Sequence, residues 1–445
     1  MRFCAIGLVA GMTAALALSA SASAGPAPRA TNDAAATTDV DWPHFRFDEK
    51  HTGYQPFETT ITKKNAKFLG LEWQAQLGDL VFSSSPAVVG GVVYIGTTDG
   101  TLWAYPADGC GSDYCDTPLW SSTYLAQIVD SPTVANGIVY VGSQTDFNSN
   151  DGKLNAFSAD GCGQAVCAPL WQGDSGPDSI LESSPTVANG LVYVGSFAGT
   201  LYAFNAEGCG QALCQPVWFA QTGGSVESSP LVYKGVVYIG SDDGKLYAFK
   251  AKGCRRSPCK ALWTGDLGNP IFESSPAISK GLVYISSQHS IAAFDAAGCG
   301  AATCSPLWQS IDNQNFFNGS PAIAYGRVYI GLEAGLAVYD AAGCGQQTCN
   351  KLWSLFGSGA QAVIASSPTV ANGVVYAGRN TGEVLAWRAD SCGQSSCNEI
   401  WKGRTEDPIV NSSPTIVNGK LYIGSSDQHF PESISGRIYV YDLQL

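Results

Sequence analysis

Short runs of β-branched and aromatic residues, separated by clusters of Gly, Asp and Ser, fill most of the chain. In one stretch these runs lie at 227–232, 236–240, 245–249 and 261–263. Runs of this length with turn residues between them are typical of strands and not of helices. We therefore expect a unit of four short strands here.

The same unit recurs along the chain at a spacing of roughly 45 residues. A Ser-Pro step opens each copy, with its proline at Pro86, Pro132, Pro185, Pro230, Pro276, Pro321, Pro368 and Pro414. A tyrosine closes each second run, at Tyr94, Tyr140, Tyr193, Tyr238, Tyr284, Tyr329, Tyr376 and Tyr422. Repeated four-strand units of this length predict an all-β fold, an eight-bladed β-propeller of antiparallel blades.

The last strand of each copy carries a tryptophan, except in the eighth copy. These residues are Trp120, Trp171, Trp218, Trp263, Trp308, Trp353 and Trp401. The eighth copy, which starts at Asn411, ends after its third strand, and a lone strand-like run around Trp73 precedes the first copy. Pairing of the two ends would complete the eighth blade and remove exposed sheet edges. We therefore expect Trp73 to lie beside the strand around Tyr439.

Fourteen of the fifteen cysteines form seven pairs of identical spacing. The pairs are Cys110/Cys115, Cys162/Cys167, Cys209/Cys214, Cys254/Cys259, Cys299/Cys304, Cys344/Cys349 and Cys392/Cys397. No histidine or second pair stands at zinc-ligand spacing. An even number of paired cysteines in an exported chain predicts disulfides, which here would each staple a small loop.

The N-terminus indicates export. Residues 1–24 read as a signal peptide that is cleaved after Ala24, and residues 25–40 read as a disordered leader. Residues 41–445 then form a single propeller domain, secreted or periplasmic. No later apolar run is long enough to span a bilayer, and Cys4 lies too early to be a lipid anchor, so we expect no membrane anchor. The formal net charge of −13 argues against nucleic acid as a partner.

The order of the strands sorts the loops onto two faces of the ring. All seven cysteine pairs fall on one face together with tight turns such as Asn136-Gly137, which indicates a structural role. The other face is irregular, with longer loops at 144–151 and 425–433 that include His429, and with His289 in a matching loop. Function is expected on the irregular face, because variable loops on a rigid scaffold commonly carry it.

The residue just before each Ser-Ser-Pro step begins an inner strand at the mouth of the central channel. Around the ring these residues are Ser83, Val129, Glu182, Glu227, Glu273, Asn318, Ala365 and Asn411. In the second blade Asp130 follows. Oxygen ligands such as those of Glu182, Glu227, Glu273 and Asn318 suit Ca²⁺.

Three interpretations of this group stay open. The three glutamates could form a calcium site, could act as catalytic acids or bases, or could be solvated and hydrogen-bonded at the strand ends. Asn318, Asn411 and Asp130 are candidates for binding a cofactor. A loop at 146–152 is similar to half of a calcium-binding loop, but a polar loop extension explains it equally well.

The repeat motifs Ser-Ser-Pro, Val-Tyr-Ile-Gly, Asp-Gly-x-Leu-Tyr-Ala-Phe and Leu-Trp resemble those of the pyrroloquinoline-quinone (PQQ) propeller superfamily. The lead-in from 41–43 to 71–73 is similar to that of quinoprotein alcohol dehydrogenases. That resemblance implies an eight-bladed disc with PQQ and Ca²⁺ in a central funnel. The chain departs from the dehydrogenases because it has no two adjacent cysteines and has Gly-Cys-x4-Cys in place of their usual turn.

Two functions follow from these observations. The first is a binding module that takes a small molecule, a glycan or a protein on the channel face. The second is an enzyme, namely a PQQ- and Ca²⁺-dependent oxidoreductase or a carbohydrate-active enzyme. The superfamily also includes outer-membrane assembly lipoproteins that use the propeller for docking, but the expected lipid-anchor cysteine is missing here. The missing cofactor landmarks favour the binding module.

Overall fold

The computed structural model describes residues 40–144, 152–180, 182–313, 315–332, 335–357, 363–427 and 435–444. The side chains of Asn318 and Asp427 also lie outside this description. The predicted signal peptide, nearly all of the predicted leader, the loop at 146–151 and His429 therefore lie outside the described residues. No helix in these described ranges is long and apolar enough to cross a membrane.

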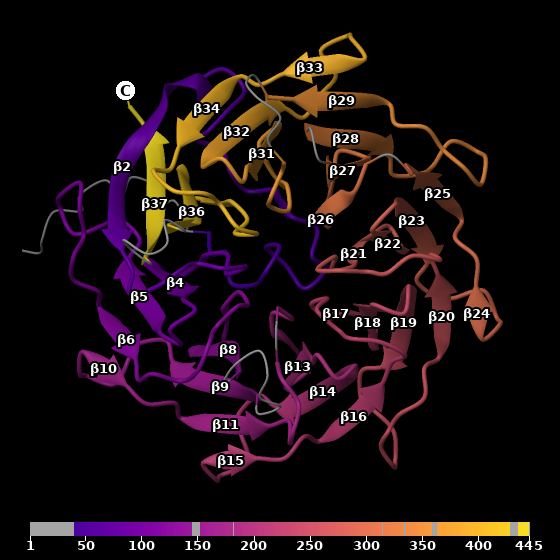
Figure 1. Cartoon of the computed structure of the whole chain (residues 1–445), viewed down its shortest axis with the longest axis horizontal. Helices are drawn as coiled ribbons and strands as arrows, with labels where there is room; N and C mark the ends of the chain where they lie inside the picture. Colours follow the sequence, from indigo (N-terminus) through magenta and orange to yellow (C-terminus); the bar gives the residue numbers. More distant parts are fainter. Residues whose placement is uncertain are drawn as a thin grey trace, which may run out of the picture. The chain divides into compact units, whose positions relative to one another are not determined.

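Eight antiparallel sheets follow one another around a ring, which confirms the predicted propeller (Figure 1). We number the blades 1 to 8 in chain order of their inner strands. Blade 1 contains β3 (Ala87–Val89), β4 (Val92–Gly96), β5 (Leu102–Pro106) and β6 (Trp120–Ser122). Blade 2 contains β7 (Thr133–Ala135), β8 (Ile138–Gln144), β9 (Gly152–Ser158) and β11 (Trp171–Asp174). Blade 3 contains β12 (Thr186–Ala188), β13 (Leu191–Gly195), β14 (Thr200–Asn205) and β16 (Trp218–Gln221). Blade 4 contains β17 (Leu231–Tyr233), β18 (Val236–Ser241), β19 (Lys245–Lys250) and β20 (Trp263–Asp266).

The second half of the ring repeats this order. Blade 5 contains β21 (Ala277–Ser279), β22 (Leu282–Ser287), β23 (Ser290–Asp295) and β25 (Trp308–Ile311). Blade 6 contains β26 (Phe317–Ala324), β27 (Arg327–Leu332), β28 (Gly335–Asp340) and β29 (Trp353–Phe356). Blade 7 contains β30 (Thr369–Ala371), β31 (Val374–Gly378), β32 (Glu383–Arg388) and β34 (Trp401–Arg404). Blade 8 contains β35 (Thr415–Val417), β36 (Lys420–Asp427), β37 (Ser435–Leu443) and β2 (Leu69–Gln76), and the 3₁₀ helix η1 (Ala66–Phe68) precedes β2.

Blade 8 is built from both ends of the chain, as expected. The strand β2 pairs antiparallel with β37, so that Trp73 lies opposite Val440 and Gln74 lies opposite Tyr439. The two strands lie side by side in Figure 1, one indigo and one yellow. Trp73 is 1% exposed and belongs to the core. The prediction that Trp73 completes the last sheet is therefore confirmed.

The repeated tyrosines and tryptophans join neighbouring blades. The Tyr193 hydroxyl and the Trp218 Nε1 of blade 3 both donate hydrogen bonds to the Ala251 carbonyl of blade 4. In blade 8, Tyr422 and Trp73 bind the Ala107 carbonyl of blade 1 in the same way. The N-terminal tryptophan thus makes the same contact as Trp120, Trp218 and Trp308, and the ring closes with a regular seam.

The cysteine turns do more than staple their own loops. The short strands β10 (Val166–Cys167), β15 (Leu213–Cys214), β24 (Thr303–Cys304) and β33 (Ser396–Asn398) each pair parallel with the outer strand of the preceding blade. Each turn therefore covers the edge of a neighbouring sheet. Gly253 shows why glycine precedes the cysteine: its φ is +71°, and a Cβ atom there would lie 2.4 Å from the Trp218 ring.

Six of the seven predicted disulfides are confirmed, with Cα–Cα distances of 5.6 to 5.8 Å, within the ordinary range for such bridges. They join Cys162 to Cys167, Cys209 to Cys214, Cys254 to Cys259, Cys299 to Cys304, Cys344 to Cys349 and Cys392 to Cys397. The prediction of a seventh is wrong, because Cys110 and Cys115 are free thiols. Cys110 Sγ lies 3.6 Å from the Tyr114 carbonyl, much as Cys299 Sγ lies 3.7 Å from the Thr303 carbonyl. The spacing and the loop therefore do not distinguish the unbridged pair from a bridged one.

The structure adds a feature that the interpretation of the pairs as loop staples did not include, because the second cysteine of each pair lies in the hydrophobic core. The first cysteine of every pair is exposed, whereas the second is buried in all seven pairs, namely at Cys115, Cys167, Cys214, Cys259, Cys304, Cys349 and Cys397. Each buried cysteine belongs to the core cluster of the preceding blade's outer tryptophan: Cys259 with Trp218, Cys349 with Trp308 and Cys397 with Trp353. A buried cysteine packs as a small apolar residue. The bridge therefore ties an exposed turn to the core between two blades.

The lead-in crosses the ring on the face of the cysteine turns. The Trp42 N–H binds the Val88 carbonyl of blade 1, and farther along, the Lys50 and Thr52 carbonyls accept bonds from inner strands of blades 5 and 6. The strand β1 (Tyr54–Gln55) then pairs parallel with β30 of blade 7. Because it bonds to inner strands on opposite sides of the ring, the lead-in passes over the axis at the end of the channel away from the mouth.

Candidate functional site at the channel mouth

A closed ring of hydrogen bonds lies just below the mouth. The second serine of each Ser-Ser-Pro step accepts a hydrogen bond from the matching backbone N–H of the preceding blade, at 2.8 to 3.1 Å. We call these residues the serine ring: Ser85, Ser131, Ser184, Ser229, Ser275, Ser320, Ser367 and Ser413. The last of these bonds runs from the Ser413 N–H to the Ser85 hydroxyl and closes the ring. The repeated motif thus serves to fasten blade to blade around the axis.

The first serine of each step has a separate structural role. In blade 4 the Ser228 hydroxyl accepts the Gly240 N–H of the second strand at 3.0 Å. In blade 2 Asp130 takes this place, and its Oδ2 accepts the Gly142 N–H at 2.6 Å. Asp130 is 1% exposed, and burial raises the pKa of its carboxyl well above the usual range. This cofactor-binding candidate is therefore a buried substitute for a serine, and it is not among the described residues that line the mouth.

The residue just before the first serine has strained backbone in four blades. The φ angles are 58° for Ser83, 60° for Glu182, 51° for Glu273 and 57° for Asn411. Asparagine tolerates this left-handed region, but a glutamate there is an outlier that costs conformational free energy. Such strain gathers at functional sites, where the surrounding structure enforces it. The strain lies at Glu182 and Glu273, two of the predicted site residues.

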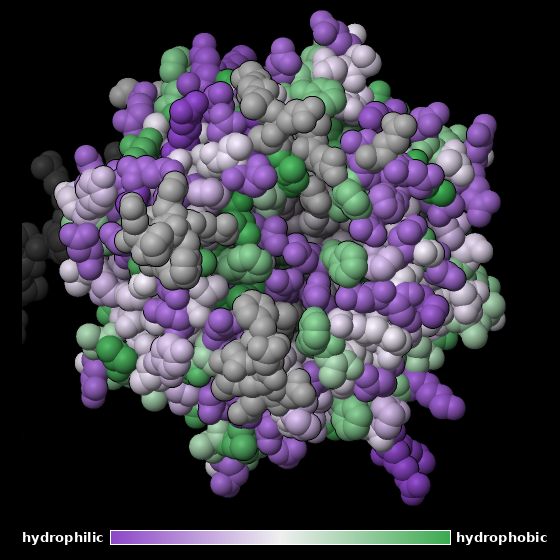
Figure 2. Space-filling model, viewed as in Figure 1, coloured by the Kyte–Doolittle hydropathy of each residue, from purple (hydrophilic) through white to green (hydrophobic). Residues whose placement is uncertain are grey.

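These strained residues line a cavity of about 400 Å³ at the mouth. The serine ring forms part of its lining through Ser184, Ser229 and Ser275, and Phe45 of the lead-in also reaches it. Phe272 and Phe316 lie at the cavity with 47% and 39% of their surface exposed. Hydrophilic and hydrophobic side chains meet around the axis in Figure 2. The cavity therefore combines carboxyl groups, hydroxyl groups and aromatic surface.

The carboxyl groups of the mouth repel one another. Burial, together with the charges of Glu273, Glu227 and then Asp242, raises the pKa of Glu182 to about 9. Burial and the charge of Glu227 raise the pKa of Glu273 to about 7, and this is opposed by a hydrogen bond of 2.7 Å from Asn411 Nδ2 to its Oε2. Burial also raises the pKa of Glu227. The three glutamates thus influence one another's ionisation, and at neutral pH protons are shared among them.

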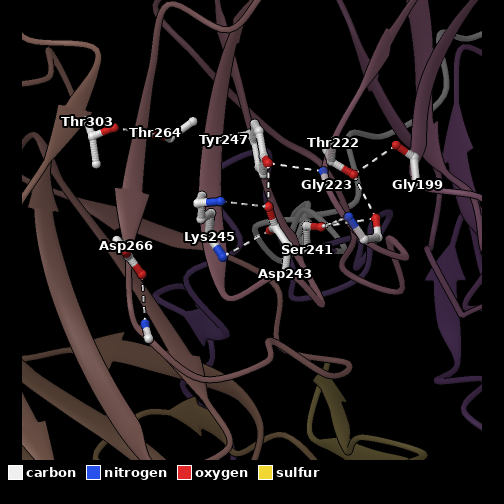
Figure 3. Close-up of polar contacts among 12 residues, drawn as sticks. Gly199, Thr222, Gly223, Ser241, Asp243, Lys245, Tyr247, Thr264, Asp266 and Thr303 are labelled. Carbon is white, nitrogen blue, oxygen red and sulfur yellow. Dashed lines mark hydrogen bonds and ion pairs between the residues drawn. The ribbon is translucent and has the colours of Figure 1, made fainter.

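Asp242 belongs to the same cluster, although the sequence did not single it out. Burial, followed by the charges of Glu227 and Asp243, raises its pKa to about 7, and its Oδ1 is buried without a hydrogen-bond partner among the described residues. The turn that carries it is held firmly: Asp243 accepts the Tyr247 hydroxyl at 2.6 Å and pairs with Lys245 at 3.1 Å (Figure 3). The sequence Ser-Asp-Asp-Gly between two strands is typical of an ordinary turn, so it gave no sign that Asp242 belongs to the site.

Of the remaining candidates, His289 lies beside this cavity. The His289 ring packs on Phe316, with 4.8 Å between ring centroids, and the neighbouring Gln288 lines the cavity. Asn318 lies in β26, but its side chain is outside the described residues. Among the described residues, no three acidic, histidine or cysteine side chains stand close enough together to hold a metal ion. The glutamates lie near one another without forming a ready-made ligand set.

The comparisons with known proteins place this ring in a family. The family model described as outer membrane protein assembly factor BamB matches residues 70–165, 164–297 and 260–432, which together span most of the chain. The chain belongs to this family. No curated protein matches it by sequence. The predicted relationship to PQQ-type propellers is therefore confirmed at the level of the repeat.

Solved structures agree on the fold. The quinohemoprotein alcohol dehydrogenase of Comamonas testosteroni is similar with a TM-score of 0.68 and 14% identity, over 92% of this chain and 81% of that one. BamB from Moraxella catarrhalis is similar with a TM-score of 0.59 and 17% identity, over 84% of this chain and 98% of that one. The computationally designed Ika8 protein gives a TM-score of 0.60 at 15% identity, over 83% and 100%. Identities this low relate the chains by fold alone.

Proposed function

We propose that the chain is an exported binding module that takes a cationic group of a small ligand or of a partner protein into the mouth cavity. The observation that supports this most directly is the strained pair Glu182 and Glu273, whose buried carboxyl groups line the cavity. The serine ring already fastens the blades, so the ring does not need glutamates at these places. Backbone strain and charge repulsion that do not stabilise the fold are features expected of a binding site.

The chemistry of the cavity favours a cation. The charges of Glu273, Glu227 and Asp242 raise the pKa of Glu182, and the charge of Glu227 raises those of Glu273 and Asp242, so a positive charge among these carboxyl groups would relieve their repulsion. The exposed rings of Phe272 and Phe316 offer faces over which an ammonium group can lie. The family description, an assembly factor, fits a role in which such a group belongs to another protein.

PQQ fits this cavity poorly. The quinone carries several carboxylates, whereas the described lining contains Glu182 and Glu273 and includes no Lys, Arg or Trp. An anionic cofactor would add to the repulsion that already raises the glutamate pKa values. The oxidoreductase alternative, which rests on the fold shared with the dehydrogenase, therefore gains no support from the lining of the mouth.

The test is thermal unfolding of the intact protein at pH 7 with spermidine or tetramethylammonium, each compared with sodium chloride at the same ionic strength. A site-specific cation raises the Tm by mass action, and the increase should disappear in the double variant Glu182→Gln/Glu273→Gln. The variant Asp266→Asn, which removes an exposed acidic residue, should keep it. Equal shifts in all three proteins, or stabilisation by PQQ with Ca²⁺ in place of the amines, would contradict the proposal.

A further inference from the structure

Blade 6 departs from the repeat on the face opposite to the mouth. The turn between the first two strands of each blade pairs a residue of left-handed conformation with a following glycine. In order around the ring that residue is Gly90, Asn136, Asn189, Lys234, Lys280, Tyr325, Asn372 and Asn418. Blade 6 is the blade with an aromatic residue there, and Arg327 stands where six blades have Val, Ile or Leu. A local break of a repeat without a gain for the fold is a mark of function.

Tyr325 is strained and yet held in place. Its φ is 52°, a conformation that bulky side chains rarely adopt, and 53% of its surface is exposed. Its hydroxyl accepts the Gly373 N–H of blade 7 at 2.9 Å. Tyr54 of the lead-in packs edge-on against its ring, with 5.1 Å between the centroids. These contacts fix an exposed aromatic ring on the surface.

A cavity of about 540 Å³ opens beside this ring, between blades 6 and 7. Its lining includes Tyr325, Arg327, Trp353, Asp390 and, from the lead-in, Lys63. Trp353 is 9% exposed, and its Nε1 has no hydrogen-bond partner among the described residues. In the comparable place of blade 5, Trp308 Nε1 binds the Ala341 carbonyl at 3.2 Å. The Trp353 Nε1 donor, like that of Trp171 in blade 2, therefore lacks the bond that Trp308 makes within the fold.

The charged groups at the cavity are all engaged in ion pairs, and Asp390 is shared between Lys63 and Arg388, whose Nε lies 3.0 Å from an Asp390 oxygen. Lys63 Nζ lies 2.8 Å from an Asp390 oxygen, and Arg327 Nη1 lies 2.7 Å from an Asp340 oxygen. The Arg327 guanidinium also lies over the Trp353 ring, 5.9 Å from its centroid. The cavity thus offers donors and acceptors in fixed directions, and each of its charged groups already has a partner of opposite charge.

The ion pairs of this cavity limit the chemical class of ligand that it can bind. An anion would have to separate Asp390 from Lys63 or Asp340 from Arg327, and a cation would meet the two basic groups. A wholly apolar ligand would bury the ion pairs without giving them new partners, which costs free energy. A neutral ligand with an apolar face and many hydroxyl groups avoids all three costs.

We propose that the cavity between blades 6 and 7 is a carbohydrate-binding site, in which a neutral sugar ring stacks on Tyr325 and its hydroxyl groups bind the paired side chains of Lys63, Arg327 and Asp390. The site lies on the face of the cysteine turns, apart from the mouth cavity. Its ligand and its residues are different from those of the proposed cation site, so either site can exist without the other.

The experiment is calorimetry of the intact protein with neutral gluco-, manno-, galacto- and chito-oligosaccharides. We expect at least one series to bind, and we expect Tyr325→Asn to weaken that binding roughly tenfold or more. Asparagine is the residue that other blades use at this turn, so this variant keeps the backbone that the fold requires. A Tm close to that of the native protein would show that the lost binding is not lost folding.

Two further variants complete the test. Lys280→Asn makes the matching change in blade 5 and should leave sugar binding unchanged, and so should the mouth variant Glu182→Gln/Glu273→Gln. Failure of all four series to bind at millimolar concentration would overturn the proposal. Undiminished binding by Tyr325→Asn would also overturn it, as would binding lost in the mouth variant and kept in Tyr325→Asn.

Discussion

The serine ring and the mouth residues occupy neighbouring positions of the same repeat, yet they are built on opposite principles. Each member of the serine ring is used in the same way, as the acceptor of a bond from the preceding blade. Two residues earlier in each repeat, the side chains differ from blade to blade, the backbone is strained at Glu182 and Glu273, and the carboxyl groups repel one another. The serine ring stabilises the fold, whereas the strained and mutually repelling residues of the mouth destabilise it.

This difference teaches where to look for function in a repeat protein. A position that is uniform in all blades and fully hydrogen-bonded has a structural explanation, as the second serine shows. A position that varies, and that is destabilising in some blades, requires another explanation. The same comparison within the chain identified Tyr325 on the opposite face.

The largest expected effect comes from breaking the ring itself. Trp73→Ala should reduce the free energy of unfolding by about 3–5 kcal/mol, because Trp73 is buried and joins blade 8 to blade 1. Leu71→Ala on the same strand changes a residue that is 42% exposed and should cost about 0.5 kcal/mol or less. Urea unfolding measures both. Similar losses for the two variants would mean that Trp73 does not close the ring.

A smaller effect is expected within the serine ring. Ser229→Ala leaves the buried Ser184 N–H without its acceptor and should cost about 1–3 kcal/mol. Ser305→Ala removes an exposed serine and should fall within about 0.5 kcal/mol of the native protein. If Ser229→Ala unfolds at the same urea concentration as its control, the ring of hydrogen bonds contributes nothing and the contrast with the mouth is lost.

The change Asp130→Ser should have the smallest effect, and it should raise stability where the other two changes lower it. It restores the repeat residue, keeps an acceptor for the Gly142 N–H and removes a buried carboxyl, so stability at pH 7 should rise by about 0.5–2 kcal/mol. Burial raises the pKa of Asp130 in the folded protein. The protein therefore becomes less stable as the pH rises above the pKa that this carboxyl has in the unfolded chain. The gain should therefore vanish below about pH 4. A gain that is equal at all pH values would point to packing and not to the charge.

Much of the fold could be predicted from the sequence because several types of residue each recur once in every repeat. Eight tyrosines and eight Ser-Pro steps gave eight units, whereas seven cysteine pairs and seven repeat tryptophans showed that the eighth unit lacks its last strand. The lone run around Trp73 supplied that strand, which placed Trp73 correctly. The left-handed backbone of Glu182 and Glu273 could not be predicted, since neither residue favours it. Asp242 was missed because its turn looks ordinary.

The cysteine pairs show a second limit of the sequence. The free thiols of Cys110 and Cys115 were missed because their spacing equals that of the six bridged pairs. The burial of one cysteine in each pair was missed as well, because it depends on how each turn packs against the preceding blade. Spacing along the chain gives the size of a loop, and contacts between blades decide which side of it is buried.

The most direct test of the strained, mutually repelling mouth is the titration of Glu182 itself. Carboxyl ¹³C NMR of the labelled protein, with Glu182→Gln used to assign the resonance, measures the pKa of this one group. A pKa of about 9 is expected, because burial and the charges of Glu273 and Glu227 oppose its ionisation. A value near the ordinary 4.5 of glutamate would contradict the account, since the carboxyl groups would then neither be buried together nor require a cation between them.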